Sequence, residues 1–418
     1  MSKLKSIVSI SVLLLPLFFS CSKQRTRASI EQSIRRVENG LVEQRIFDLE
    51  TGVIKFELMD EIFQADKAQL ANRKTLAERM KHYNTPGVSI AAINMNRIEW
   101  AKGYGSMDVN TGTPVSTETI FEGASTSKML TAVLALHFVQ EGLIELDANV
   151  NNHLKSWQMP ENEFTVKEKV TLRRLLTHQA GLPSTNYDHD ENIGYPTLID
   201  VLNGRSPALN KPAMPECVPG SRWQYSNIGY NVIQLLIEEV SGKSFQRVAE
   251  EIIFNPLEMK SSTFVYPLDP ERRKFEAMPH DDEGKSRKPV MHLTALAQGG
   301  LTTTPTDLAK FIIELMRSYK GKSEKMLSRE MTRRFFTKEC EIDQEKFPLP
   351  FYQGLGVFLM GEGKNLAFTH PGNNYPGLNC WPMGWPERGT GAVIMCNAGM
   401  YGILNIEIVS AINREYNQ

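Results

Sequence analysis

The sequence lacks an excess of charge of either sign, because its 47 lysines and arginines nearly equal its 48 aspartates and glutamates. A protein that neutralises a run of phosphates needs a basic excess, so we expect no nucleic-acid partner. The chain also lacks a long apolar run. Its longest, residues 7–19, is too short to span a bilayer comfortably, and no solenoid repeat interrupts an otherwise globular composition.

Signatures of metal sites are missing as well. No pair of cysteines or histidines has the spacing of zinc ligands, and the HExxH motif is absent. We therefore predict no metal and no cofactor. The Gly-x-Ser-x-Gly elbow of α/β-hydrolases is also absent, since Gly123-Ala124-Ser125 runs on to Ser127.

The N-terminus has the pattern of an export signal. Lys3 and Lys5 precede the apolar run 7–19, which ends in Ser20 and Cys21. We interpret residues 1–21 as a signal peptide with Cys21 as the lipid attachment site, the alternative being simple cleavage beside an incidental cysteine. The protein is then periplasmic or in the cell envelope, anchored to a membrane by its lipid.

Four further cysteines remain in the chain, too few and too scattered for a disulfide framework to be deduced from their spacing. We favour buried thiols over disulfides for all four, which are Cys217, Cys340, Cys380 and Cys396.

Strand patterns occur at both ends of the chain and helical patterns occupy the middle. Residues 22–75 are mostly polar and predict a tether or loosely packed extension, so the folded domain is assigned to 76–418. A hairpin over 88–103 opens that domain, and short strands from 351 to 396 precede a final helix. A mainly helical portion, about 130–315, lies between these sheet-forming ends.

The first segment that indicates chemistry is Ser125-Thr126-Ser127-Lys128. Serine is a favoured helix N-cap, and a lysine three positions later lies one turn away on the same face. The helix dipole and burial both disfavour the charged amine, so we expect a lowered pKa that lets Lys128 act as a general base. The same spacing occurs at Ser2 and Ser20, but only Ser125 precedes an amphipathic helix, predicted over 129–139.

The second segment is Tyr225-Ser226-Asn227, at the start of a helix predicted over 228–240. We interpret Asn227 as the N-cap of that helix. A phenol beside a serine and a lysine can relay a proton to a leaving group, and an asparagine can bind a substrate amide or hold the lysine. The alternative is an aromatic core residue followed by a cap.

The third segment, His370-Pro371-Gly372-Asn373, follows a strand. Gly372 allows substrate to approach the backbone closely, and an N–H in this turn could join the N–H of Ser125 in an oxyanion hole. His370 would then lie beside the carboxylate or carbonyl of the substrate, although a lone histidine is more often structural.

In this order, the three segments resemble the superfamily of serine β-lactamases and penicillin-binding proteins. The resemblance is to the branch that holds class C β-lactamases, DD-peptidases, D-aminopeptidases and related esterases. Tyr225-Ser226-Asn227 matches the tyrosine-x-asparagine element of that branch, and His370-Pro371-Gly372 stands where many members have lysine-threonine-glycine. Supporting segments include Leu175 to Leu182, Asn255 to Met259 and Gly299 to Leu301.

The resemblance implies an α/β fold of the α+β kind, with an antiparallel sheet from both chain ends flanked by helices and a mainly helical domain beside it. It implies acyl transfer on Ser125, with Lys128 or Tyr225 as the base and the N–H groups of Ser125 and Asn373 as the oxyanion hole. Substrate-binding roles fall on Asn227, His370, Gly372 and Asn373.

Esterase and D-amino-acid peptidase activities remain open, with a small molecule or a peptide, peptidoglycan fragments included, as substrate. The histidine in place of lysine makes antibiotic hydrolysis a less favoured main task. The competing hypothesis is a catalytically silent penicillin-binding or sensing lipoprotein of the same fold.

Overall fold

The structure, a computed structural model, describes residues 25–42, 47–48, 53–54, 70–186, 188–190, 192–289, 294–342, 351–374, 377–398 and 402–417. The predicted signal peptide and Cys21 lie outside these ranges. Within them, no helix combines the length and the apolar character that crossing a membrane requires.

A large antiparallel sheet forms the centre of the molecule. Its strand order is β5-β4-β3-β14-β13-β11-β10-β9-β8, and β12 pairs with β13. The predicted hairpin forms β3 and β4, and β3 pairs along its length with β14, from Gly391 opposite Ile93 to Cys396 opposite Val88. The prediction that the two ends of the chain supply one antiparallel sheet is therefore confirmed.

The strands of this sheet are β3 (Gly87–Asn94), β4 (Arg97–Asp108), β5 (Thr113–Pro114), β8 (Cys340–Glu341), β9 (Tyr352–Gln353), β10 (Phe358–Met360), β11 (Ala367–Thr369), β12 (Gly372–Asn374), β13 (Leu378–Trp385) and β14 (Thr390–Cys396). Two small two-stranded sheets pair β1 (Phe47–Asp48) with β2 (Val53–Ile54), and β6 (Phe121–Glu122) with β7 (Thr302–Thr303).

The helices are α1 (Arg27–Glu38), α4 (Leu76–His82), α5 (Ser127–Gln140), α6 (Leu172–Leu176), α7 (Leu198–Asn203), α8 (Asn227–Ser241), α9 (Phe245–Ala249), α10 (Pro270–Arg273), α11 (Leu296–Gly299), α12 (Pro305–Tyr319), α13 (Arg329–Phe335) and α14 (Ile403–Asn417). A π-helical turn, η4 (Glu250–Phe254), extends α9, and short 3₁₀ turns include η1 (Ala124–Thr126).

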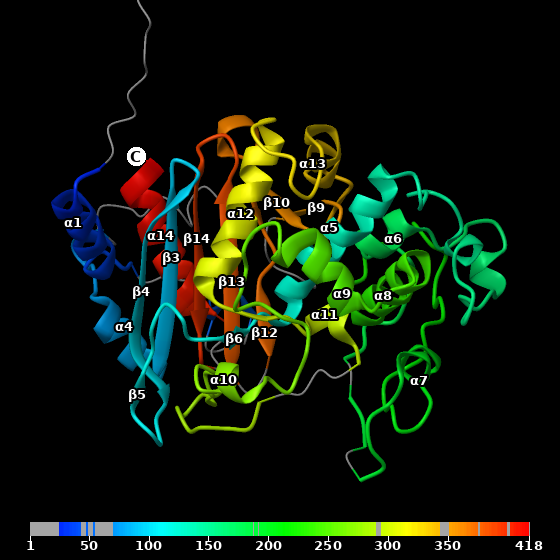
Figure 1. The fold of residues 1–418 in the computed structure, drawn as a ribbon, viewed down its shortest axis with the longest axis horizontal. Coiled ribbons are helices and arrows are strands. Elements are labelled where there is room, and N and C mark those ends of the chain that lie inside the picture. The colour runs from blue at the N-terminus through cyan, green and yellow to red at the C-terminus, as the bar shows by residue number, and fades with distance from the viewer. Residues whose placement is uncertain are drawn as a thin grey trace, which may run out of the picture.

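Helices cover both faces of the sheet, and each face has its own hydrophobic core. Helix α12 packs on one face, whereas α14 packs on the other together with α1 and α4. The core on the α12 face continues into the helical part of the molecule, which contains α5, α6, α8 and α9 and lies to the right in Figure 1. The core on the α14 face is separate and contains most of the tryptophans.

Helix α5 lies inside the helical part. It was predicted to be amphipathic, but it is buried on every side. Every residue from Ser127 to Leu136 is buried. A helix that is apolar all round needs neighbours on every side, and α8, α11 and α13 all contact it. Its interior position places the side chain of Lys128 out of water.

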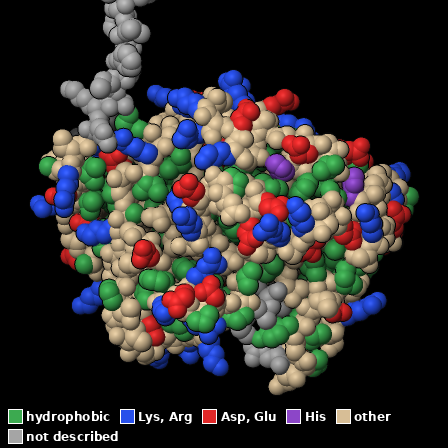
Figure 2. All heavy atoms as spheres, viewed as in Figure 1, with side chains coloured by type: hydrophobic (Ala, Val, Ile, Leu, Met, Phe, Trp, Pro, Cys, Tyr) green, Lys and Arg blue, Asp and Glu red, His purple; other side chains and the backbone are tan. Residues whose placement is uncertain are grey.

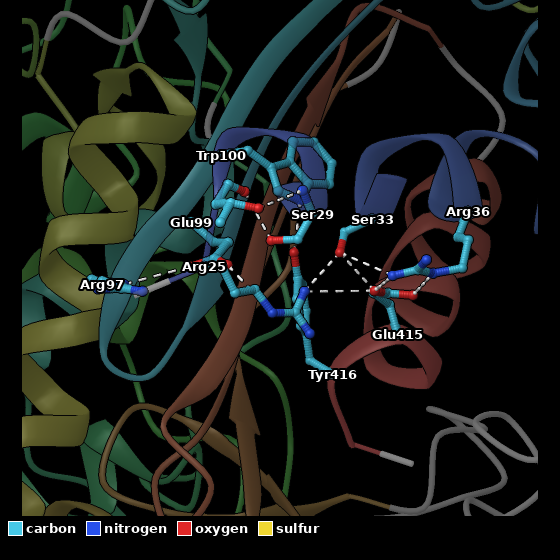
Figure 3. A network of polar contacts seen from close by, with 10 residues as sticks. Arg25, Ser29, Ser33, Arg36, Arg97, Glu99, Trp100, Glu415 and Tyr416 are labelled. Atoms are coloured by element: carbon cyan, nitrogen blue, oxygen red, sulfur yellow. Dashed lines mark hydrogen bonds and ion pairs between the residues drawn. The ribbon is translucent and has the colours of Figure 1, made fainter. Parts of the chain in front are cut away.

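Within residues 25–42, helix α1 packs against α14, where a loosely packed extension was predicted. Thr26 caps α1, and Arg36 forms hydrogen bonds of 2.7 and 2.5 Å to the carboxylate of Glu415 on α14. Ser33 is fully buried and donates to the same carboxylate, as Figure 3 shows. This part of the polar N-terminal stretch is therefore integral to the α14 face.

A buried ion pair ties α4 to the same helix. Arg79 donates two hydrogen bonds, of 2.9 and 2.7 Å, to Glu407, and the Tyr83 hydroxyl donates a third of 2.8 Å. Both charged side chains are almost fully buried. Such a pair stabilises the fold only while complete, because removing one partner leaves a buried charge unpaired.

The four cysteines in the described part of the chain are free thiols. Cys380 and Cys396 are buried on adjacent strands, and burial raises the pKa of each to about 12. Cys217 and Cys340 are only half-buried, so the prediction of four buried thiols holds for two.

Charges of both signs are scattered over the surface. In Figure 2, basic and acidic side chains alternate across the visible face without a large patch of one sign. This distribution agrees with the near-neutral sequence.

Candidate active site

Ser125 lies in a tight turn between β6 and α5, and it is not the helix N-cap that was predicted. The turn is η1, and the residue before the serine, Ala124, has a φ of +46° that L-residues rarely adopt. Thr126 is the residue that precedes α5, and no side chain caps the helix. The turn holds the hydroxyl of Ser125 half-exposed at the edge of the helical part.

Neighbouring hydroxyls fix the shape of this turn. Ser127 Oγ donates to the Ala124 carbonyl over 2.6 Å and accepts from the Leu301 N–H over 3.0 Å. Thr126 Oγ1 donates to the His370 carbonyl over 2.8 Å. The turn is thus fastened both to the segment after α11 and to the strand end that carries the third motif.

Lys128 meets Ser125 as the spacing predicts. Its Nζ lies 3.2 Å from Ser125 Oγ and 2.6 Å from the Gln298 carbonyl, and the side chain is fully buried. Burial lowers the pKa of Lys128 well below its usual value. No carboxylate pairs with it among the described residues, so the neutral amine can accept the serine proton.

Tyr225 is the third member of this group, brought in from the start of α8. Its hydroxyl hydrogen-bonds Ser125, and Lys128 Nζ lies 5.1 Å from the centre of its ring. Burial raises the pKa of Tyr225, and the bond to Ser125 opposes that change without reversing it. The phenol is therefore neutral at working pH and can pass a proton onward.

Asn227 is placed differently from its prediction. Ser226 is the N-cap of α8, and Asn227 is the first residue of the helix. The side-chain amide of Asn227 donates to Asn186 over 3.0 Å, so this contact does not hold the lysine. One turn further on, buried Asn231 donates to the side chain of Gln298, whose carbonyl accepts from Lys128.

His370 is buried near Tyr225, with the ring centres of the two side chains 6.3 Å apart. The side chain is 1 % exposed, and its ring stacks on Phe358 with centroids 4.6 Å apart. Burial, assisted by Lys128, lowers the pKa of His370 to about 3. A neutral, stacked ring makes His370 a structural wall of the site, so replacing it with alanine should cost stability as well as alter substrate preference.

Gly372 allows a close approach, as predicted, but the group that approaches it is the protein backbone at Gly123 and not the substrate. A Cβ on Gly372 would lie 2.0 Å from the Gly123 carbonyl oxygen and 3.0 Å from Ser125 N. Strand β12 therefore packs its backbone directly on the nucleophile turn. Asn373, the next residue, is exposed and donates from its side chain to Asn379 over 2.6 Å.

His178, from the supporting segment Leu175 to Leu182, is a site residue that was not among the predicted ones. Its Nδ1 accepts from the Ser226 N–H over 3.1 Å, and its ring lies 4.3 Å from that of Tyr225. It is 2 % exposed, and burial lowers its pKa well below the usual value. His137, in contrast, contacts the Met326 carbonyl and takes no part in this group.

Two variants test whether His178 positions Tyr225. Asparagine keeps an acceptor for the Ser226 N–H and tolerates the φ of +57° at this position, but it lacks the ring. We expect His178→Ala to lower both kcat and the free energy of unfolding, the latter by about 2 kcal/mol. His178→Asn should recover stability but not kcat. Recovery of both would leave His178 a purely structural residue.

Gln298 is a site residue that could not be predicted from the sequence. Gln298 acts through its backbone carbonyl, which every residue type carries, so no sequence pattern marks it.

The described residues contain no group of three or more histidines, cysteines or carboxylates that could hold a metal ion.

Known proteins resemble this chain in sequence and in fold. It is 27% identical over 233 residues to Protein flp of Staphylococcus aureus (strain MW2), covering 54% of this chain and 45% of that protein. It is 28% identical over 218 residues to a putative D-alanyl-D-alanine carboxypeptidase of Escherichia coli O157:H7, covering 50% and 49%. The matched regions thus span about half the length of these relatives.

Solved structures match over a larger share of the chain. The octameric penicillin-binding protein homologue from Pyrococcus abyssi has a TM-score of 0.66 and 26% identity, covering 80% of this chain and 74% of that one. A penicillin binding protein from Bacillus halodurans has a TM-score of 0.64 at 22% identity, covering 81% and 98%, which shows the fold alone.

The family comparison extends across most of the domain. The sequence model described as Beta-lactamase matches residues 72–400, from just before α4 to just before α14. Ser125, Lys128, Tyr225 and His370 all fall within this match. The chain therefore belongs to the Beta-lactamase family, within the superfamily of serine β-lactamases and penicillin-binding proteins.

Proposed function

We propose that this protein is an exported serine hydrolase that forms an acyl-enzyme on Ser125 and hydrolyses an ester or amide. The observation that carries the proposal is the fully buried Lys128 amine, 3.2 Å from the Ser125 hydroxyl. A buried amine without a carboxylate partner is held neutral, which is the protonation state of a general base. Family membership supports hydrolase chemistry without fixing the substrate.

The reaction would proceed by two acyl transfers. Ser125 Oγ bonds to the substrate carbonyl carbon as its proton moves to Lys128 Nζ, and the leaving group departs with a proton delivered through Lys128 or Tyr225. Water then attacks the carbonyl carbon of the acyl-enzyme and gives a proton to the same pair. The bond from that carbon to Ser125 Oγ breaks as the pair returns the proton to Oγ, which frees the serine and releases the acid. The N–H groups of Ser125 and Asn373 are the proposed oxyanion donors.

The charge of the site favours esters over substrates with a free carboxylate. A lysine in the third motif would offer a cation, whereas His370 is neutral above its pKa of about 3. A substrate carboxylate would therefore find no positive charge from this residue. The name of the Escherichia coli relative, in turn, makes a D-alanyl-D-alanine peptide the amide to test.

One preparation assayed on three substrates tests this preference. We expect hydrolysis of short p-nitrophenyl esters to exceed that of a D-alanyl-D-alanine peptide and of nitrocefin. The ratio of kcat/KM values is the measurement, with the Ser125→Ala variant as the background control. A higher kcat/KM for the peptide would contradict the charge argument while leaving the Ser125 chemistry intact.

Covalent labelling separates an enzyme from a silent binding protein. Purified protein is treated with a fluorophosphonate and, separately, with a fluorescent penicillin, and its intact mass is followed with time. Labelling on Ser125 followed by substrate turnover supports the hydrolase. A stable penicillin adduct without any turnover would favour a penicillin-binding sensor, and no adduct with either probe would exclude a reactive Ser125.

We also propose, from residues 1–21, that the protein is carried to the cell envelope and tethered through lipid on Cys21. Expression with a labelled fatty acid and comparison with Cys21→Ala tests this. Label retained in the variant, or absent from the parent, would contradict the tether.

A further inference from the structure

A pocket of about 400 Å³ lies on the α14 face, where the C-terminal ends of α1 and α14 come together. The described residues that line it include four arginines, Arg35, Arg36, Arg73 and Arg414, and a single acidic residue, Glu415. None of these residues belongs to the elements that carry Ser125, Lys128, Tyr225 or His370. The pocket is thus a second feature, independent of the candidate active site.

The fold assembles these arginines from three distant parts of the chain. Arg35 and Arg36 come from the last turn of α1, and Arg414 from the last turn of α14. Arg73 joins them because the backbone of Leu41 pairs with that of Lys74 through two hydrogen bonds, of 3.2 and 2.8 Å. The positive charges are therefore gathered by tertiary structure, not by a basic run in the sequence.

Only one of the four arginines has its charge matched. Arg36 donates two hydrogen bonds to the carboxylate of Glu415, and Figure 3 shows this bidentate ion pair bridging α1 and α14. No ion pair to Arg35, Arg73 or Arg414 occurs among the described residues. The C-terminal ends of two helices supply together about one negative charge. With the Glu415 carboxylate, the described residues of the pocket leave about two positive charges uncompensated.

The environment of Arg414 is unfavourable for its positive charge. Its Nη2 donates to the Gly40 carbonyl over 2.8 Å, while its Nη1 is buried without a hydrogen-bond partner. Burial, and then repulsion from Arg73, lower the pKa of Arg414 to about 10. A buried donor without an acceptor is unfavourable, and an anion in the pocket would offset the repulsion between Arg414 and Arg73.

We propose that this pocket binds a phosphate group with two negative charges, carried either by a soluble phosphomonoester or by a phospholipid headgroup. Guanidinium groups match the oxygens of phosphate with paired N–H donors, which a lone ammonium does not do. A phosphomonoester carries about −1.5 to −2 charges at pH 7, close to the excess in the pocket. The volume of the pocket, about 400 Å³, is within the range of small-molecule sites.

Titration calorimetry with glycerol 3-phosphate tests the soluble source. We expect binding at pH 7.5 that weakens at pH 5, because the second pKa of a phosphomonoester is about 6. The double variant Arg35→Gln, Arg73→Gln should lose at least about tenfold in affinity, since both side chains are exposed and form no ion pair with any residue that the structure describes. Arg317→Gln, an exposed arginine on α12, is the matched control and should change nothing.

Cosedimentation with vesicles tests the lipid source. The full chain and the double variant share the same N-terminus, so any membrane binding through residues 1–24 is common to both. A larger bound fraction on phosphatidic acid vesicles than on phosphatidylcholine vesicles, lost in the double variant, identifies a headgroup. Binding in neither assay, or binding equal in parent and double variant, overturns the proposal.

Discussion

Replacing Lys128 with methionine should slow acylation of Ser125 by about 10²–10⁴-fold, the usual contribution of a positioned general base. The Lys128 amine lies 3.2 Å from Ser125 Oγ, so it is placed to accept the serine proton. Because it is fully buried, it is held in the neutral form that can accept a proton. Methionine has a similar length and no amine. The rate of fluorophosphonate labelling, followed by intact mass, is the measurement.

Stability should change little in this variant, which separates chemistry from folding. Burying an amine carries a desolvation cost that a thioether lacks, so the thermal midpoint of Lys128→Met should equal or exceed that of the parent. Lys155→Met, at an exposed position, serves as a control with unchanged labelling. Labelling of Lys128→Met at the parental rate would remove the lysine from the mechanism.

Adding one methyl group at Gly372 should lower kcat/KM by about 10²–10³-fold, the loss expected when one oxyanion donor is displaced. A Cβ there would stand 2.0 Å from the Gly123 carbonyl oxygen, which belongs to the backbone and cannot rotate aside. Strand β12 or the Ser125 turn must therefore move. Activity on an ester substrate and the thermal midpoint are measured together for Gly372→Ala.

Gly229→Ala is the matched control for this substitution. A Cβ at Gly229 meets its nearest neighbours at 3.5 Å or more, which is ordinary contact, and the residue lies within helix α8. We expect activity close to that of the parent. If Gly372→Ala kept full activity, the contact between β12 and the nucleophile turn would have no role in catalysis.

The sheet could be predicted from the sequence because its signals are local. Runs of apolar and β-branched residues mark β3, β4 and β14, and a short turn at Met95 and Asn96 separates the first two strands. Helix α1 was missed because its residues are polar, and its buried positions, Ser33 and Val37, make sense only against α14. Docking of that kind depends on a partner almost 400 positions away, which no local pattern contains.

The candidate site was predictable in its spacing and not in its details. A separation of three positions between Ser125 and Lys128 suffices to bring amine and hydroxyl together, whatever the turn. The positive φ at Ala124 places the helix start beyond the serine. An alanine in the sequence does not predict a positive φ, so this turn could not be foreseen. Similarly, Asn227 and Asn231 lie one turn apart, and only tertiary packing decides which of them faces Gln298.

The pH dependence of Ser125 acylation tests most directly whether a buried, neutral lysine activates the serine. An ordinary lysine titrates near 10.4, whereas burial lowers the pKa of Lys128 well below that. The labelling rate should rise with pH as Lys128 loses its proton and reach its plateau well below pH 10, with no further limb from Tyr225, whose pKa is raised. A rate that keeps climbing through pH 10, or one identical in Lys128→Met, would contradict the account.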